Sequence, residues 1–258
     1  MTSKRKRWLA GTALLCAMAV AAGALLLREW QRHITEPLVI HQGWRASQVY
    51  KAADKALSVP GGTTEKAAER AAREGKLKLP EAAKGNPEGY LYPATYHVKR
   101  DTSPEALVTR MSKAAHRHLN AADSTDYESL IIASIIQAEA DNPEDMAKVA
   151  RVINNRLKRD MPLQMDSSIN YALDRSTLNT SIADTHISSP YNTYRHKGLP
   201  PTPINNPGPE ALKATKNPAK GDWLYFVTVK PGDTRFTADY DEHKKWVTEF
   251  NTEQRNGA

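Results

Sequence analysis

Residues 125–157 read TDYESLIIASIIQAEADNPEDMAKVARVINNRL and predict two consecutive helices. Thr125 and Glu128 have the S/T-x-x-E spacing of a capping box just before an apolar run, so the first helix should begin there, with Glu128 as a capping residue. Asn142 and Pro143, followed by two acids, indicate the start of the second helix, because a cap, a proline and acidic residues are typical of a first turn. The second helix has one apolar face, formed by Met146, Val149, Ala150, Ile153 and Leu157.

Glu139 falls on a face of the first helix where a charged residue is unexpected. With an advance of about 100° per residue from Ile131, Glu139 lies at about 80°, inside the arc of the neighbouring isoleucines. It should therefore be desolvated and its pKa raised, as a general acid near neutral pH requires. Two alternatives stay open: the carboxyl lies in solvent at a frayed helix end, or it forms a structural pair with Arg151 or Arg156.

Nearby motifs supply the other groups that a sugar-cleaving site needs. Such sites combine a carboxyl of raised pKa with amides and aromatic faces that hold pyranose rings. The segment LQMD places Gln164 and Asp166 on alternate residues, hence on one side of a strand end. The segment SPYNTY places Asn192 between Tyr191 and Tyr194. Each fragment is weak alone, because Asp166 would also suit a helix cap and the tyrosines a core. Together with Glu139, which lies on an apolar face of its helix, they predict a substrate-binding cleft.

The remaining pattern alternates between helices and short strands. The expected helices cover residues 46–57, 64–73, 104–119 and 239–254, and the expected strands cover 162–165 and 223–229. The loop at 188–209 is rich in proline and glycine, and long loops of this type are often functional. The predicted fold class is therefore α+β.

The N-terminus predicts a membrane anchor. Basic residues at 4–7 precede 20 residues without a charge, WLAGTALLCAMAVAAGALLL (8–27). At about 1.5 Å per residue this run spans roughly 30 Å, the thickness of a bilayer's hydrocarbon core. The basic residues should stay cytoplasmic, which places the chain after Arg28 outside. The main alternative is a cleaved signal peptide, since Ala19-Val20-Ala21 resembles a small-residue cleavage site.

The net charge of the chain follows from this anchor. The 258 residues carry 36 Lys and Arg against 29 Asp and Glu, a formal net charge of +7. Residues 1–33 hold six basic residues and one acid, a net of +5, which leaves +2 for the other 225. The pI of about 9.3 is therefore mostly a membrane-topology signal, and no nucleic-acid partner is expected. The single cysteine, Cys16, excludes an internal disulfide framework and a cysteine-based metal cluster.

A series of motifs resembles the membrane-anchored endolytic murein transglycosylases, the MltG/YceG-like family. In order along the chain they are EGYLYPATY (88–96), ASIIQAE (133–139), VINNRL (152–157), LQMD (163–166), SPYNTY (189–194), GLPP (198–201), NPG (206–208) and LYFV (224–227). The Q-A-E form at 137–139 resembles the actinobacterial branch. In the family, a basic tail (1–7) and one membrane helix (8–27) precede a LysM-like module and a catalytic domain, which map here to 36–85, in shortened form, and 86–258.

The resemblance implies cleavage of the β-1,4 bond between N-acetylmuramic acid and N-acetylglucosamine in nascent peptidoglycan. The product would carry a 1,6-anhydro-muramyl end. The family's catalytic glutamate maps to Glu139, the residue that the helical geometry also selects. Glu139 would first protonate the departing glycosidic oxygen and then deprotonate the muramyl C6 hydroxyl, which attacks C1 in place of water.

The companion residues are expected to bind the substrate. Gln164 and Asn192 would hold N-acetyl groups or the developing charge, and Tyr191 and Tyr194 would pack on sugar faces. Asp166 is the motif candidate for a second acid, which a hydrolase would need, and is expected instead to orient other groups. For each of the four binding residues the alternative is a scaffolding role.

No cofactor and no metal ion is expected, since His116 and His118 have no third ligand placed nearby. The expected partners are peptidoglycan glycan strands, peptidoglycan synthases, and the membrane through the N-terminal helix. The expected location is the cell membrane, with a single pass and an extracytoplasmic catalytic domain. The alternative function is an inactive membrane-anchored scaffold that recruits the synthases.

Overall fold

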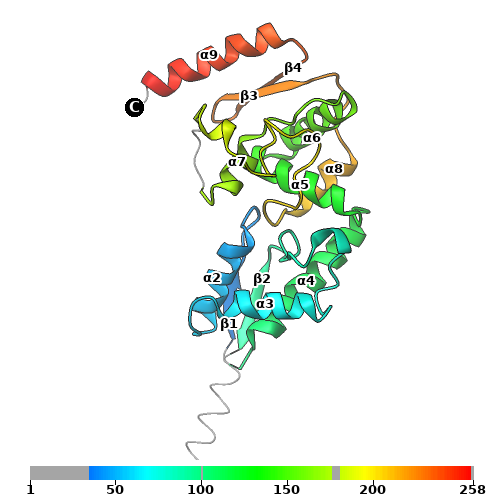
Figure 1. Ribbon diagram of the computed structural model, residues 1–258, viewed down its shortest axis with the longest axis vertical. Coiled ribbons are helices and arrows are strands. Elements are labelled where there is room, and N and C mark those ends of the chain that lie inside the picture. The colour runs from blue at the N-terminus through cyan, green and yellow to red at the C-terminus, as the bar shows by residue number, and fades with distance from the viewer. Residues whose placement is uncertain (1–34, 100, 176–180, 257–258) are drawn as a thin grey trace, which may run out of the picture.

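The computed structural model describes residues 35–99, 101–175 and 181–256. The first part of the described chain holds a two-stranded antiparallel sheet, β1 (Thr35–Val39) and β2 (Thr95–Lys99), with Thr35 opposite Lys99. Helices α2 (Ala46–Ala56) and α3 (Thr63–Arg73) lie between these strands in the chain. The long helix α4 (Pro104–Ala121) packs on α3 and leads into the second part (Figure 1).

The second part is built around α5 (Tyr127–Glu139). Helices α6 (Pro143–Lys158) and α8 (Pro209–Lys216) pack against α5 and against each other. The short helix α7 (Asp166–Ala172) follows α6 and also contacts α5. The second part therefore places one helix, α5, in contact with three others.

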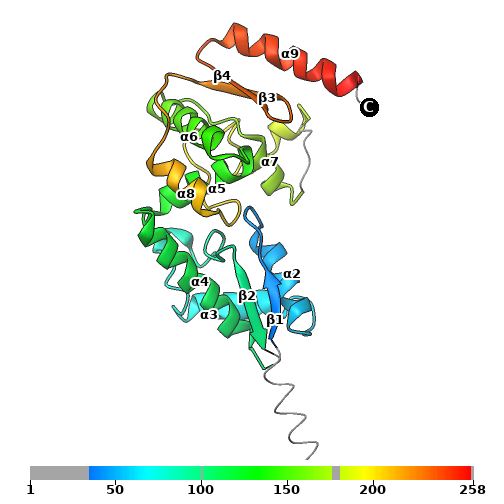
Figure 2. The ribbon, with the colours of Figure 1, turned by 180° about the vertical axis from the view of Figure 1, so that it is seen from behind.

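The chain ends in a β-hairpin and a helix. Strand β3 (Tyr225–Lys230) pairs with β4 (Asp233–Thr237), and α9 (Tyr240–Asn256) packs on β3. Two single turns of 3-10 helix, Glu81–Ala83 and Asp184–His186, lie in the connecting loops. Figures 1 and 2 show α9 at the end of the molecule opposite to the β1–β2 pair.

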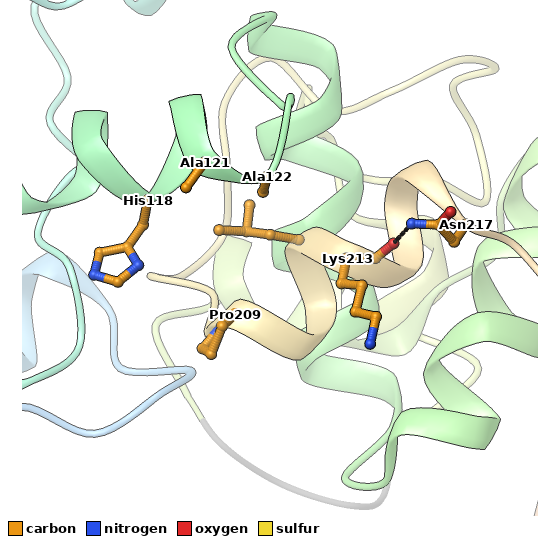
Figure 3. Close-up of a pocket in the computed structure, with 7 residues that line it drawn as sticks. His118, Ala121, Ala122, Pro209, Lys213 and Asn217 are labelled. Atoms are coloured by element: carbon orange, nitrogen blue, oxygen red, sulfur yellow. Dashed lines mark hydrogen bonds between the residues drawn. The ribbon is translucent and has the colours of Figure 1, made fainter.

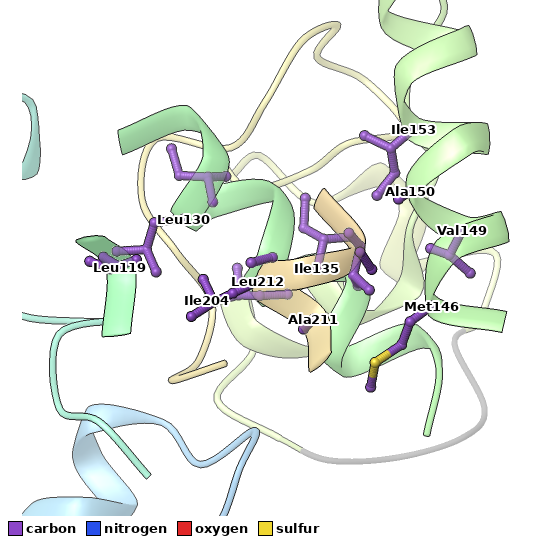
Figure 4. Close-up of a cluster of buried hydrophobic side chains, with 14 of the residues drawn as sticks. Leu119, Leu130, Ile135, Met146, Val149, Ala150, Ile153, Ile204, Ala211 and Leu212 are labelled. Carbon is purple, nitrogen blue, oxygen red and sulfur yellow. The ribbon is translucent and has the colours of Figure 1, made fainter. Parts of the chain in front are cut away.

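The core consists of two hydrophobic clusters, and the one around α5 also includes Tyr90, Tyr92 and residues of α4. In the second part, Ile135 and Ile136 of α5 are fully buried. Figure 4 shows Ile153 of α6 and Leu212 of α8 directed toward the same interior. Because α5 buries side chains at successive positions rather than along one stripe, it is a central helix of this cluster. The other cluster joins β1, β2, α2 and α3 and extends to Met111 in α4.

The two helices predicted at 125–157 are present, but the first begins one residue later than expected. Asp126, and not Thr125, is the N-cap, and its carboxylate accepts the Ser129 N–H at 2.7 Å. A carboxylate accepts a backbone N–H more strongly than a neutral hydroxyl does, which explains the preference. The predicted start of the second helix is confirmed, since Asn142 caps α6 and Pro143 is its first residue.

The strand predicted at 162–165 is wrong. Only an isolated bridge joins Pro162 to Lys197, and Gln164 has a left-handed φ of 51°. Proline has no N–H to donate, and a left-handed residue turns the chain, so a strand ladder cannot extend through this segment. The strand predicted at 223–229 is confirmed as β3 with shifted ends, and its partner β4 was not predicted.

The other helices predicted are confirmed as α2, α3, α4 and α9, within about two residues at each end, and the α+β class is confirmed with them. The predicted basic tail and membrane helix, residues 1–27, lie outside the described residues. Among the residues that are described, no helix is both long and apolar enough to cross a membrane. The LysM-like module at 36–85 stays a prediction.

Candidate active site

Glu139 is the last residue of α5 and contacts the start of α7. Its Oε1 accepts a hydrogen bond from the Ser167 hydroxyl at 2.6 Å. The residue is half-buried, yet burial is the largest influence on its carboxyl and raises its pKa. The negative charge of Asp166 raises the pKa further, while the hydrogen bonds from Ser167 lower it. The raised pKa predicted from the helical geometry is therefore confirmed.

The two arginines considered as structural partners of Glu139 bind elsewhere. Arg151 donates from Nε to the Ala219 carbonyl at 2.5 Å, and Arg156 donates from Nε to the Leu224 carbonyl at 2.6 Å. No basic residue contributes to the pKa of Glu139. The ion-pair alternative for Glu139 with these two residues is therefore wrong.

Asp166 is the first residue of α7, directly before Ser167, and accepts a hydrogen bond from the Tyr194 hydroxyl at Oδ1. Burial and the Asp166 carboxylate both raise the pKa of Tyr194, so its hydroxyl stays protonated and remains a donor. The charge of Glu139 acts on Tyr194 in the same direction. We call Glu139, Asp166, Ser167 and Tyr194 the acid cluster.

Thr193 holds the loop that carries Tyr194 against the segment that begins α7. Its carbonyl accepts the Gln164 N–H at 3.0 Å, and its hydroxyl accepts the Met165 N–H at 2.9 Å. Thr193 is only 2% exposed, so these bonds are shielded from water. They fix the loop of Tyr194 against the residues that begin α7, and in this way they place Tyr194 beside Asp166.

Gln164 does not share a strand face with Asp166, and the prediction that it does is wrong. The left-handed backbone at Gln164 ends the alternation of side chains, and α7 begins two residues later. The Gln164 side chain is exposed, and its Oε1 accepts a hydrogen bond from Arg156 Nη1 at 3.1 Å. Its role in substrate binding stays a prediction.

Asn192 and Tyr191 lie deeper than a sugar-binding role would suggest. Asn192 is fully buried, and its Nδ2 donates to the carbonyls of Thr185 and Ile187 at 3.0 and 2.9 Å. The Tyr191 hydroxyl is hydrogen-bonded to Thr202 at 2.8 Å. These contacts favour the scaffolding alternative for both residues, while their part in substrate binding stays a prediction.

Sequence reasoning did not single out Ser167 or Thr193. Both lie inside or beside the motifs that carry the other residues, but a hydroxyl side chain has no periodicity that marks it as functional. Their roles depend on contacts between segments about 28 residues apart, Ser167 with Glu139 and Thr193 with Met165. Such contacts cannot be inferred from local spacing.

A separate pocket lies between the end of α4 and α8 (Figure 3). Its volume is about 350 Å³, and its lining residues are His118, Ala121, Ala122, Pro209, Leu212, Lys213 and Asn217. It contains no predicted site residue and offers no carboxyl group. Within the described ranges, no three His, Cys, Asp or Glu side chains gather in a way that could hold a metal ion.

Comparison with known proteins connects this arrangement to one family. A model described as the YceG-like family matches residues 15–249. A solved crystal structure of a yceG-like protein from Listeria monocytogenes is similar, with a TM-score of 0.71 and 33% sequence identity. That similarity covers 81% of this chain and 75% of the Listeria chain.

Curated relatives are similar over a shorter length. An endolytic murein transglycosylase from Streptococcus pneumoniae is 38% identical over 175 residues, which cover 63% of this chain and 32% of the relative. One from Bacillus subtilis is 39% identical over 166 residues, covering 61% of this chain and 46% of the relative. The matched region thus spans less than half of each of these two relatives.

Proposed function

This chain belongs to the YceG-like family, and from that premise we propose that it is an endolytic murein transglycosylase of the lyase type. The relatives that carry this name are longer, so the activity is inferred from the shared region and from the acid cluster. The substrate is peptidoglycan, and the bond cleaved is the β-1,4 link from N-acetylmuramic acid to N-acetylglucosamine. The product end is 1,6-anhydro-N-acetylmuramic acid.

Glu139 acts first as an acid and then as a base. Protonated Glu139 donates its proton to the glycosidic oxygen, and the bond from that oxygen to the muramyl C1 breaks. The carboxylate then accepts the proton of the muramyl C6 hydroxyl as its oxygen bonds to C1. Glu139 ends protonated, no water is consumed, and one carboxyl serves both steps.

The observation that carries the proposal is the desolvated carboxyl of Glu139 at the end of α5, with the Ser167 hydroxyl as its donor. Burial raises the pKa of Glu139, which favours the protonated form that a general acid needs, and the Ser167 hydroxyl donates to its Oε1. A hydrolase would need a second carboxyl to act as nucleophile or to activate water. Asp166 is already bound to the Tyr194 hydroxyl, which favours an orienting role for it.

The other assignments are extensions of this proposal. Gln164 holds an N-acetyl group or the developing charge, and Tyr194 packs on a sugar face. Asn192 and Tyr191 support the loop through their hydrogen bonds to other loop residues. The chain is anchored in the cell membrane by one helix at 8–27, its catalytic domain is extracytoplasmic, and peptidoglycan synthases are partners. The residues at 36–85 form a shortened LysM-like module, and the chain comes from the actinobacterial branch.

The alternative is an inactive membrane-anchored scaffold that recruits synthases. The intact acid cluster argues against it, because a scaffold has no use for a desolvated carboxyl at a helix end. The two functions differ in one measurable property, the chemical products released from peptidoglycan.

The test is muropeptide analysis by mass spectrometry after digestion of purified peptidoglycan with the full chain. The wild type should release products with anhydro ends, and Glu139→Gln should reduce them by at least about a hundredfold, since a general acid commonly contributes that much. Glu128→Gln is the matched control, because Glu128 is an exposed glutamate in the first turn of the same helix. It should retain the wild-type rate.

Other outcomes would refute parts of the proposal. Reducing ends that have gained water would identify a hydrolase, and an absence of products from both the wild type and Glu128→Gln would favour the scaffold. The anchor is tested separately by membrane fractionation with N-terminal sequencing. A mature chain that begins near Ala22 would contradict it.

A further inference from the structure

Glu88 is a buried carboxyl at the junction of the two parts of the molecule. It is 3% exposed and accepts hydrogen bonds from three separate segments. Oε1 accepts the N–H of Ala46, the first residue of α2, at 2.9 Å, and Nδ2 of Asn206 at 3.3 Å. Oε2 accepts the hydroxyl of Tyr171, in α7, at 3.3 Å. Glu88 thus connects α2, the loop at 206 and α7.

The charged neighbour of this carboxyl is Arg45. Its guanidinium lies 5.2 Å from the centre of the Tyr171 ring and donates to the Arg175 carbonyl at 2.7 Å. Tyr50 of α2 and Tyr127 of α5 also face Glu88, and burial raises the pKa of both phenols. The neighbours of Glu88 are therefore hydrogen-bond donors, one cation and neutral rings.

Helix α7 joins this junction to the acid cluster. Tyr171 and Ser167 are four residues apart on α7, so their side chains share one face, a single turn apart. Ser167 contacts Glu139 at one end of α7, and Tyr171 contacts Glu88 at the other. A helix of seven residues has little stability of its own. Ile169 and Ser168 are fully buried, and the hydroxyl of Ser168 is hydrogen-bonded to that of Thr193 at 2.9 Å, which fixes the middle of α7. The hydrogen bonds of Ser167 and Tyr171 fix the face of α7 that lies toward Glu139 and Glu88.

We propose that Glu88 and Tyr171 form a positioning pair that sets the rotation of α7 and so holds the Ser167 hydroxyl on Glu139. This inference rests on the proposed function, because the pair serves the reaction of Glu139. Both residues act through α7, and neither contacts the reacting atoms. The pair also explains why a carboxyl from the first part of the chain is buried against the part that holds the acid cluster.

The test compares Tyr171→Phe with Ser167→Ala in the full chain. Tyr171→Phe removes the hydroxyl bound to Glu88 and keeps the ring that faces Arg45. Because the Ser167 bond lowers the pKa of Glu139, each variant should raise that pKa. A general acid must be protonated, so the fall of kcat/KM at high pH should move to higher pH in both variants. For Tyr171→Phe, kcat should also fall about tenfold, with KM within about twofold of the wild type.

The variant that combines Tyr171→Phe with Ser167→Ala tests whether the two residues act together. If Tyr171 acts through Ser167, the pKa of Glu139 in this double variant should equal that in Ser167→Ala alone, because the effects of coupled residues do not add. Tyr127→Phe is the matched control. Its hydroxyl is buried without a hydrogen-bond partner among the described residues, so its removal should leave the pH profile unchanged.

Carbon-13 NMR of labelled glutamate side chains reads the pKa of Glu139 without catalysis. If the wild type makes no anhydro product, the proposed function fails while this titration still tests the positioning pair. An unchanged Glu139 pKa in Tyr171→Phe, or a shift in the double variant equal to the sum of the single shifts, would overturn the pair.

Discussion

Replacement of Glu88 by glutamine should change how the stability of the protein depends on pH. Burial raises the pKa of Glu88 from 4.5 to about 7, so the folded protein binds one more proton than the unfolded chain between these values. The contribution of Glu88 to stability is therefore complete below about pH 4.5 and is lost as the pH rises to about 7. Integrated from pH 5 to pH 8, the loss is about 2.5 kcal/mol, which Glu88→Gln should not show.

The assay is urea unfolding of the wild type and Glu88→Gln at several values of pH from 5 to 8. The free energy of unfolding of the wild type should fall relative to that of the variant as pH rises. Glu139 is present in both proteins, so its own raised pKa cancels in the comparison. Glu81→Gln, at an exposed glutamate, controls for the loss of a surface carboxyl and should run parallel to the wild type. The reasoning would be refuted if the free energy of unfolding of Glu88→Gln changed with pH in parallel with that of the wild type. It would also be refuted if the wild type gained stability toward pH 8.

Gly89→Ala should lower the free energy of unfolding in urea by at least about 2 kcal/mol, because its φ is +84° and a Cβ would meet a proline ring at 2.9 Å. Gly61→Ala, where no atom lies within 4 Å, should change it by less than about 1 kcal/mol. Arg156→Ala should cost at least about 3 kcal/mol in the same assay, since it leaves several backbone carbonyls unbound. Asp166→Asn removes a negative charge that raises the pKa of Glu139, so the high-pH fall of kcat/KM should move to lower pH.

Much of the fold was predictable because its signals are local. The start of α6 depends on Asn142 and Pro143, and its apolar face depends on residues a few positions apart. Glu139 was found from the helical wheel because α5 is regular up to its last residue. The strand prediction at 162–165 failed because Gln164 has a left-handed backbone and its N–H donates to the carbonyl of Thr193, about 29 residues away, and local spacing indicates neither feature.

The acid cluster was predictable only in part, for a similar reason. Asp166 and Tyr194 stand in motifs, but which residue would contact Glu139 depends on how α7 meets α5. The structure places Ser167 there, with a bond of 2.6 Å, and places Asn192 inside the loop. Alternation along an extended chain predicted only that Gln164 and Asp166 share one side. The packing of α7 on α5 therefore places Ser167 at the carboxyl.

The acid cluster distinguishes its two carboxyls by their surroundings. The hydroxyl of Tyr194 donates a hydrogen bond to Asp166, whereas Glu139 accepts its side-chain hydrogen bond from Ser167. The negative charge of Asp166 and burial both raise the pKa of Glu139, so the surroundings of Glu139 favour its protonated form. The Ser167 bond acts in the opposite direction and limits how far the pKa rises. An acid that must release its proton and then accept another needs this balance, because a carboxyl held too firmly in either state can perform only one of the two steps.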